Sequence, residues 1–224
     1  MKFLRVTGVA LFALALLVAL SAPASAVTYN FTNITCNNVE CAQLGSQLQM
    51  DVLSAGVVGG VSYVDFKFTN NIGIASSITD IYFDDGTLLG ISNITSSAGV
   101  VFAQGANPGN LPSGNNANPA FQTTAGFSAD SSPPAAPNGV NTASEWVTIT
   151  FALINGKTYA DTLAALADGT LRVGLHVQAI GVAGGSDSFI HVPEPGFYGL
   201  LSMGLAGLGF FAMRRRRSVG PQAE

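Results

Sequence analysis

Five segments of the chain alternate apolar and polar residues with a period of two, at residues 47–52, 63–68, 80–84, 147–153 and 171–178. This alternation is typical of strands that have one face in a core and the other in solvent. The third segment would place Ile81 and Phe83 in the core and Tyr82 in solvent. We therefore predict an all-β fold, an antiparallel β-sandwich, for residues 27–192.

One short helix interrupts the series of strands. Thr158 can cap its first turn, and Asp161 follows three residues later in the spacing of a capping box. Leu163 and Leu166 share one face, and Gly169 can end the helix in the left-handed conformation. We expect this helix to cover one end or one edge of the sandwich.

Residues 104–144 differ in composition from the strands around them. The segment holds six of the ten prolines, many Gly and Asn residues, and a single charge, Asp130. Two interpretations are open, a long disordered insertion or a binding loop, and the composition favours disorder. If the segment is ordered, Phe121 and Phe127 are the residues that could make it a contact surface.

The first 26 residues have the pattern of a secretory signal peptide. Lys2 and Arg5 precede an uninterrupted apolar stretch at 8–20, and Ala24 and Ala26 match a small-x-small cleavage site. The apolar stretch is too short for a comfortable membrane span. The sequence therefore predicts export and a mature chain that begins near Val27.

A second apolar run lies near the other end of the chain. Residues 196–213 carry no charge, and as a helix they would just span the hydrocarbon core of a bilayer. Four arginines follow, Arg214, Arg215, Arg216 and Arg217. Since each arginine is costly to move through lipid, we expect the run to stop transfer as a single transmembrane helix. Residues 27–192 would then lie outside the inner membrane as an ectodomain, with 218–224 as a short cytoplasmic tail.

A proline pair precedes this apolar run. Pro193 and Pro195 fix φ and disfavour helix at the residues before them, so Glu194 should sit in an extended, exposed segment. The order of tripeptide, apolar run and terminal arginines closely resembles the PEP-CTERM sorting signal of Gram-negative bacteria. The resemblance implies recognition by an exosortase, an integral-membrane enzyme that processes the tail and delivers the ectodomain to the cell surface or exopolysaccharide.

Three stretches of the ectodomain are also similar to ectodomains that carry this sorting tail. They are residues 146–153, 171–178 and 184–189. The similarity implies a shared fold and supplies no reaction.

Charge is unevenly distributed along the chain. Residues 27–192 hold eleven acidic side chains against three basic ones, a formal charge of −8, whereas the whole chain is at −4. Nucleic-acid binding requires clustered Lys and Arg, so an ectodomain this acidic is a poor candidate for it. We take the carboxylates as solvated groups that favour solubility.

Cys36 and Cys41 are the only cysteines, and both belong to the exported part. An oxidising compartment favours their pairing in a structural disulfide. Metal binding would need more ligands than two thiols, and the sequence places no histidine near them.

The remaining candidates for chemistry form no recognisable constellation. The alternation puts His176 on an exposed strand face, and His191 lies beside the juxtamembrane segment. Asp80, Asp84 and Asp85 could offer oxygen ligands to Ca²⁺, but without the regular calcium-loop spacing an Asp-Asp-Gly hairpin turn is favoured. We expect no catalytic residue, no metal site and no cofactor.

Three hypotheses for function follow from these patterns. The favoured one is a non-enzymatic surface or extracellular-matrix protein that is anchored transiently by its tail. The alternative is a carbohydrate-binding module that holds exopolysaccharide, with Tyr63, Tyr82 and Trp146 as outward aromatic side chains. A secreted hydrolase is least favoured, because no nucleophile with a base or pair of carboxylates can be named.

Overall fold

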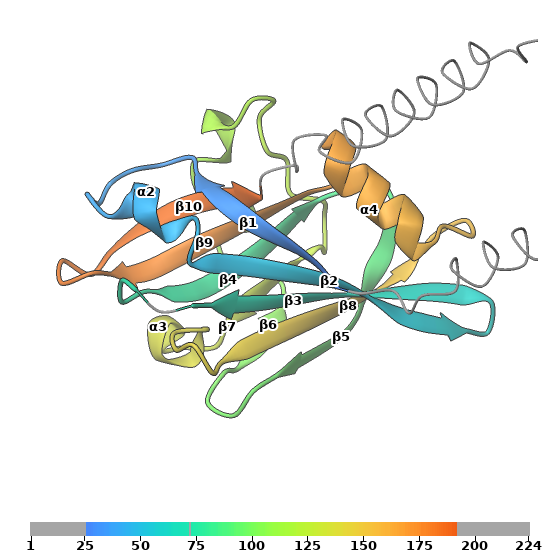
Figure 1. Ribbon diagram of the computed structural model, residues 1–224, viewed down its shortest axis with the longest axis horizontal. Coiled ribbons are helices and arrows are strands. Elements are labelled where there is room, and N and C mark those ends of the chain that lie inside the picture. Colours follow the sequence, from blue (N-terminus) through green and yellow to red (C-terminus); the bar gives the residue numbers. More distant parts are fainter. Residues whose placement is uncertain (1–25, 72, 192–224) are drawn as a thin grey trace, which may run out of the picture.

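The computed structural model describes residues 26–71 and 73–191 (Figure 1). Its elements, in chain order, are β1 (Val27–Asn33), α2 (Cys41–Leu44), β2 (Leu48–Val58), β3 (Val61–Asn70), β4 (Ser77–Asp84), β5 (Leu88–Ser96), β6 (Phe102–Gln104), the 3-10 turn η1 (Gly114–Asn116), β7 (Ser128–Ser131), α3 (Ala135–Asn138), β8 (Trp146–Leu153), α4 (Tyr159–Asp168), β9 (Arg172–Ile180) and β10 (Gly185–His191).

The strands form a ten-stranded sheet in the order β5-β8-β3-β2-β1-β10-β9-β4-β7-β6. Every neighbouring pair is antiparallel. The first half of β1 pairs with β2 and its last residues pair with β10, so β1 is the corner at which the sheet folds over. The two edge strands, β5 and β6, come into contact, which leaves the sheet nearly closed.

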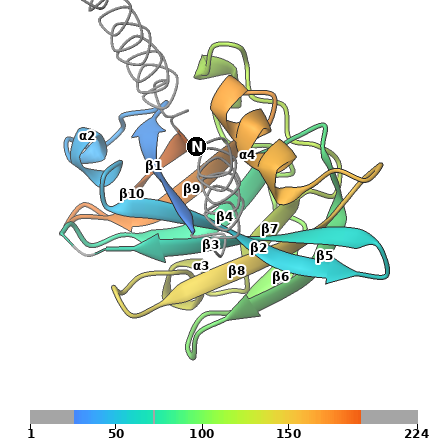
Figure 2. The same cartoon turned by 45° about the vertical axis from the view of Figure 1, so that its right-hand side comes forward.

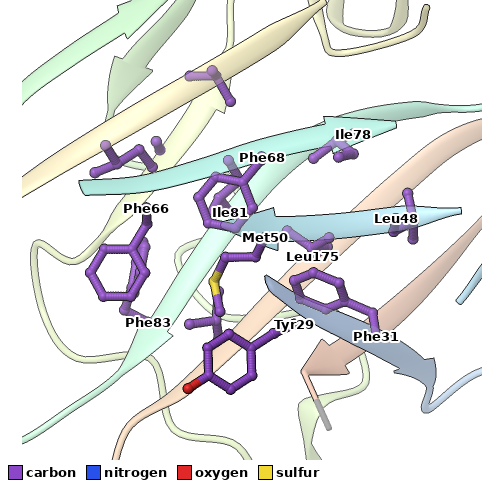
Figure 3. Close-up of a cluster of buried hydrophobic side chains, with 14 of the residues drawn as sticks. Tyr29, Phe31, Leu48, Met50, Phe66, Phe68, Ile78, Ile81, Phe83 and Leu175 are labelled. Carbon is purple, nitrogen blue, oxygen red and sulfur yellow. The ribbon is translucent and has the colours of Figure 1, made fainter. Parts of the chain in front are cut away.

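The core lies between the two halves of this sheet (Figure 3). Phe66 of β3 and Phe83 of β4 meet edge to face with ring centroids 5.2 Å apart, although their strands are not neighbours in the sheet. Phe151 of β8 joins them at 4.7 Å from Phe83. Edge-to-face contacts of this kind add to the burial of the aromatic rings and tie the two halves together.

The five strands predicted from alternation are confirmed as β2, β3, β4, β8 and β9. In β8, for example, every second residue is buried, beginning at Val147. Alternation did not predict the other five strands, β1, β5, β6, β7 and β10. In the edge strand β5, for example, Gly90 and Asn93 accompany two register shifts in the pairing with β8, and these shifts break the regular alternation.

The predicted helix is α4. The Thr158 side chain accepts from the backbone N–H of Asp161, and the Asp161 carboxylate accepts from the backbone N–H of Thr158, so the capping box is complete. Gly169 ends the helix with a φ of 78°. Leu166 is buried in the core, and the Tyr159 hydroxyl donates to the Val52 carbonyl at 2.9 Å, which fixes the helix over one end of the sheet.

The prediction of disorder for 104–144 is wrong. The segment contains η1, β7 and α3, and β7 pairs with both β4 and β6. Leu111 and Phe121 are buried with Tyr82 in a second hydrophobic cluster, separate from the main core. A few apolar side chains and one edge strand therefore order a segment whose composition is otherwise typical of coil.

Several predictions fall outside the described residues. They are the signal peptide with Ala24, the tripeptide Pro193, Glu194 and Pro195, the apolar run, the arginines from Arg214 to Arg217, and the tail 218–224; Ala26 is the first described residue. In the ranges 26–71 and 73–191, no helix has the length and apolar character needed to cross a membrane.

Candidate functional site

The outer face of β4 is the most unusual surface of the domain, because it is covered. Seven of its eight residues, from Ser77 to Phe83, are buried, which a strand with one wet face would not show. The prediction that Tyr82 faces solvent is wrong: its side chain is buried and its hydroxyl donates to the Pro108 carbonyl at 3.0 Å. The segment 104–127, which we call the insertion, lies on this face and excludes water from it.

Three titratable side chains meet on this covered face, one from each of three neighbouring strands. Asp80 of β4 lies opposite His176 of β9 on one side and opposite Asp130 of β7 on the other. The Asp80 Oδ2 atom is 2.8 Å from the His176 Nδ1 atom and 2.9 Å from the Thr79 hydroxyl that donates to it. A side-chain hydrogen bond joins Asp80 to Asp130. We call Asp80, Asp130 and His176 the acid–histidine cluster.

The surroundings of the acid–histidine cluster penalise negative charge. Burial and the neighbouring Asp80 carboxylate raise the pKa of Asp130 to about 6. Burial, and then the charges of Asp80 and Asp130, also raise the pKa of Tyr82 far above its ordinary range. Asp130 therefore keeps its proton to a higher pH than an ordinary carboxyl group, and the charge of His176 opposes this effect.

His176 is consequently not the exposed residue that alternation predicted. Only 14% of its side chain is accessible, and the ring is held against Asp80. His176 lies on the outward face of β9, as alternation predicted, but the insertion covers part of that face. The acid–histidine cluster lies on a packed surface rather than in an open cleft.

At the other end of the covered face, Arg172 fixes the insertion to the sheet. Its guanidinium pairs with the Asp84 carboxylate and donates to the carbonyls of Pro119 and Ala120. The same group lies 5.3 Å from the ring centroid of Phe121, a cation–π contact.

Gly174 lies between these two ends of the covered face. A Cβ there would sit only 2.7 Å from the Leu111 side chain, so a residue without a side chain is what allows the insertion to dock closely.

The carboxylates considered for Ca²⁺ do not converge. Asp80 faces His176, Asp84 faces Arg172, and Asp85 folds back on its own turn, where its carboxylate accepts from the backbone N–H groups of Thr87 and Leu88. The predicted hairpin is also wrong, since the turn connects β4 to β5, and these strands lie in opposite halves of the sheet. No group of metal-binding side chains that could hold an ion occurs among the described residues.

The disulfide between Cys36 and Cys41 is present, as the sequence predicted. The buried Asp187 side chain of β10 holds the loop that this disulfide closes. This carboxylate accepts from the Thr35 hydroxyl at 2.8 Å and from the backbone N–H of Asn37 at 2.7 Å, and Asn38 supplies two further donors. The loop and β10 are thereby joined as one structural unit.

His191 also has a structural role. Its ring is buried, accepts from the backbone N–H of Val173 at Nδ1 and lies 3.3 Å from the Leu166 carbonyl at Nε2. Burial lowers its pKa from the ordinary value. His191 therefore ties the end of β10 to α4 and β9, and the juxtamembrane segment beside it in sequence lies outside the described residues.

The aromatic side chains proposed to stack on sugars do not form a platform. Tyr82 is buried, and Tyr63 and Trp146 lie near opposite ends of the β3–β8 pair, opposite Ala152 and Thr69 respectively. Strand geometry separates them by about 20 Å. The Lys67 ammonium lies 5.7 Å from the Trp146 ring, which occupies part of the face that a sugar would need.

The segment that follows His191 carries the decisive comparison. Residues 191–217 match the PEP-CTERM protein-sorting motif. The chain therefore carries a sorting signal of the kind that exosortases recognise, and the match includes the tripeptide, the apolar run and all four arginines. No curated protein and no solved structure shows a significant match to the chain.

Proposed function

We propose that the protein is an exported, non-enzymatic surface or extracellular-matrix protein, anchored transiently by its PEP-CTERM signal and processed by an exosortase. The observation that carries the proposal is the junction of the two parts: the motif begins at His191, the residue with which β10 ends. The sorting signal thus continues directly from the last strand of the folded domain.

Two features of the domain support the proposal of a non-enzymatic role. Its main titratable cluster, with Asp80 and His176, is covered by the insertion, and its other buried carboxylate, Asp187, is saturated by donors from the disulfide loop. Both sites stabilise chain connections. Surface or matrix proteins need such reinforcement because they act where no chaperone or reducing pool maintains them.

Two variants of the full chain separate sorting from membrane retention. Deletion of 193–217 should release the domain in soluble form, since it removes both the tripeptide and the apolar run. Replacement of Pro193, Glu194 and Pro195 by alanine keeps the apolar run and the arginines, so this variant should stay in the inner membrane unprocessed. Fractionation and intact mass measure both outcomes, and processing of the alanine variant at the natural rate would refute the proposal.

A further inference from the structure

The hairpin formed by β2 and β3 projects from one end of the domain (Figure 2). Burial along β2 alternates as far as Val52, and every residue from Ser54 to Val58 is exposed. Beyond this point the two strands pair with each other and with no third strand except where β8 begins to flank β3 at Tyr63. Residues 54–58, at the tip of the hairpin, therefore form an ordered structure that contributes no buried side chain to the core.

The chemistry of this tip is apolar. No charged residue occurs from Val52 to Val64, and the side chains of Val57 and Val58 are each 67% exposed. Because consecutive strand residues point to opposite faces, the two valines are exposed on both sides of the hairpin. Gly59 and Gly60, both with positive φ, close the turn as a two-residue hairpin loop requires.

The last strand of the domain runs in the direction in which the hairpin points. Both β10 and β2 run antiparallel to β1, so their carboxyl ends point the same way. His191 lies opposite Phe31, and Val27 lies opposite Val52. Along the strands Val58 is therefore about ten residues, or about 33 Å, beyond His191.

The apolar run begins within that reach. Residues 192–195 can extend by about 13 Å at most before the run starts at Gly196. The tip lies about 20 Å farther along the strands than Gly196 can reach. A bilayer that the run enters at this point therefore meets the hairpin end of the domain with the strands inclined to the bilayer surface.

The helix α4 lies between the end of β10 and the hairpin in both ribbon views. Its exposed residues are Ala160, Ala164, Ala167 and Asp168, three of which are small and apolar. Asp161 and Asp168, at the two ends of the exposed side, favour a bilayer without net negative charge.

We infer that Val57 and Val58 at the tip of the β2–β3 hairpin insert into the interface of the bilayer that holds the C-terminal apolar run. The inference rests on the proposed function, because it requires membrane entry of that run. The inserted tip is a second contact, made at high effective concentration once the tail is anchored. It holds the domain down on the membrane in a fixed orientation.

A fluorescent probe at the tip tests the inference in the full chain, reconstituted into phosphatidylcholine vesicles. Val58→Cys carries a thiol-linked, polarity-sensitive dye, and the native Cys36–Cys41 pair does not react because it is a disulfide. Val182→Cys is the matched control, since this valine is fully exposed in the turn between β9 and β10, at the opposite end of β10 from His191.

Insertion predicts a blue shift of the dye at position 58 and a loss of its emission to lipid-borne quenchers, with neither change at position 182. Adding Val57→Asp to the Val58 probe should abolish both signals, because a carboxylate at the tip opposes entry into lipid. Protein that floats with the vesicles while the dye at position 58 stays unquenched overturns the inference alone. The inference is also overturned if the tip pairs with a second copy of the chain, which energy transfer between the dyes of two chains would reveal. Protein that fails to float overturns the membrane step of the proposed function as well.

Discussion

Replacing Asp130 with asparagine should stabilise the protein at neutral pH, even though it alters a side chain with a hydrogen-bonded partner. The perturbation is small in shape, because an asparagine amide can still donate to Asp80. It removes one of the two negative charges that β4 and β7 bring together under the insertion. The covered carboxyl pair is thus a site at which the fold tolerates a destabilising charge.

The magnitude follows from the pKa of Asp130. Burial and the Asp80 charge raise it from 3.8 to about 6. A difference of about two units corresponds to about 3 kcal/mol, at about 1.4 kcal/mol per unit. Asp130 is only partly buried, so screening by solvent reduces the expected gain in unfolding free energy to about 1–2 kcal/mol.

The difference in stability between the variant and the natural protein should change with pH in a defined direction. A carboxyl group with a raised pKa in the folded state favours folding while it is protonated, and that contribution is lost as the pH rises through about 6. The Asp130→Asn variant and the natural protein should therefore be equally stable below about pH 4. The variant should gain its advantage between about pH 4 and 7 and keep it at pH 8.

Urea unfolding followed by the fluorescence of Trp146, the only tryptophan, measures both proteins at each pH. Comparing the two proteins is essential, because the lowered pKa of buried His191 makes both lose stability on acidification below about pH 6.5. Asp51→Asn, which removes one carboxylate from β2 in the other half of the sheet, is the matched control. A variant less stable than the natural protein at pH 8, or a difference independent of pH, would refute the reasoning.

Two further predictions test the remaining elements. Thr158→Ala removes the side-chain cap of α4 and should lower the unfolding free energy by about 1 kcal/mol in the same urea assay, whereas Thr158→Ser, which keeps the hydroxyl, should leave it nearly unchanged. Phe121→Ala removes the buried ring on which Arg172 rests and should cost about 3 kcal/mol. Limited proteolysis of this variant should cut within 104–127 first; unchanged resistance there would contradict the docking role of Phe121.

The sequence predicted the strands better than it predicted their environments. Alternation located β4 correctly and assigned Phe83 to the core, because the periodicity of a strand is independent of what covers it. It then assigned Tyr82 and Asp80 to solvent on the assumption that the second face is wet. Only the docked insertion makes that assumption fail, and composition indicated no docking for a segment so rich in Pro, Gly and Asn.

The acid–histidine cluster could not be predicted for a related reason. Asp80, Asp130 and His176 are separated by long stretches of chain, and they meet only because β4 lies between β7 and β9 in the sheet order. That order depends on long-range pairing, which a single sequence does not encode in local periodicity. The disulfide and the capping box of α4 were predictable because their partners lie within a few residues of one another.

The electrostatic arrangement of the domain bears on its proposed place in a surface matrix. Each of its three basic side chains has a local partner: Arg172 pairs with Asp84, Lys157 lies 3.9 Å from Asp161, and Lys67 lies over Trp146. The excess of acidic side chains is therefore left without basic groups that could receive a polyanion. A field of one sign repels polymers of the same sign, so this charge distribution disfavours direct association with a strongly anionic exopolysaccharide at low ionic strength.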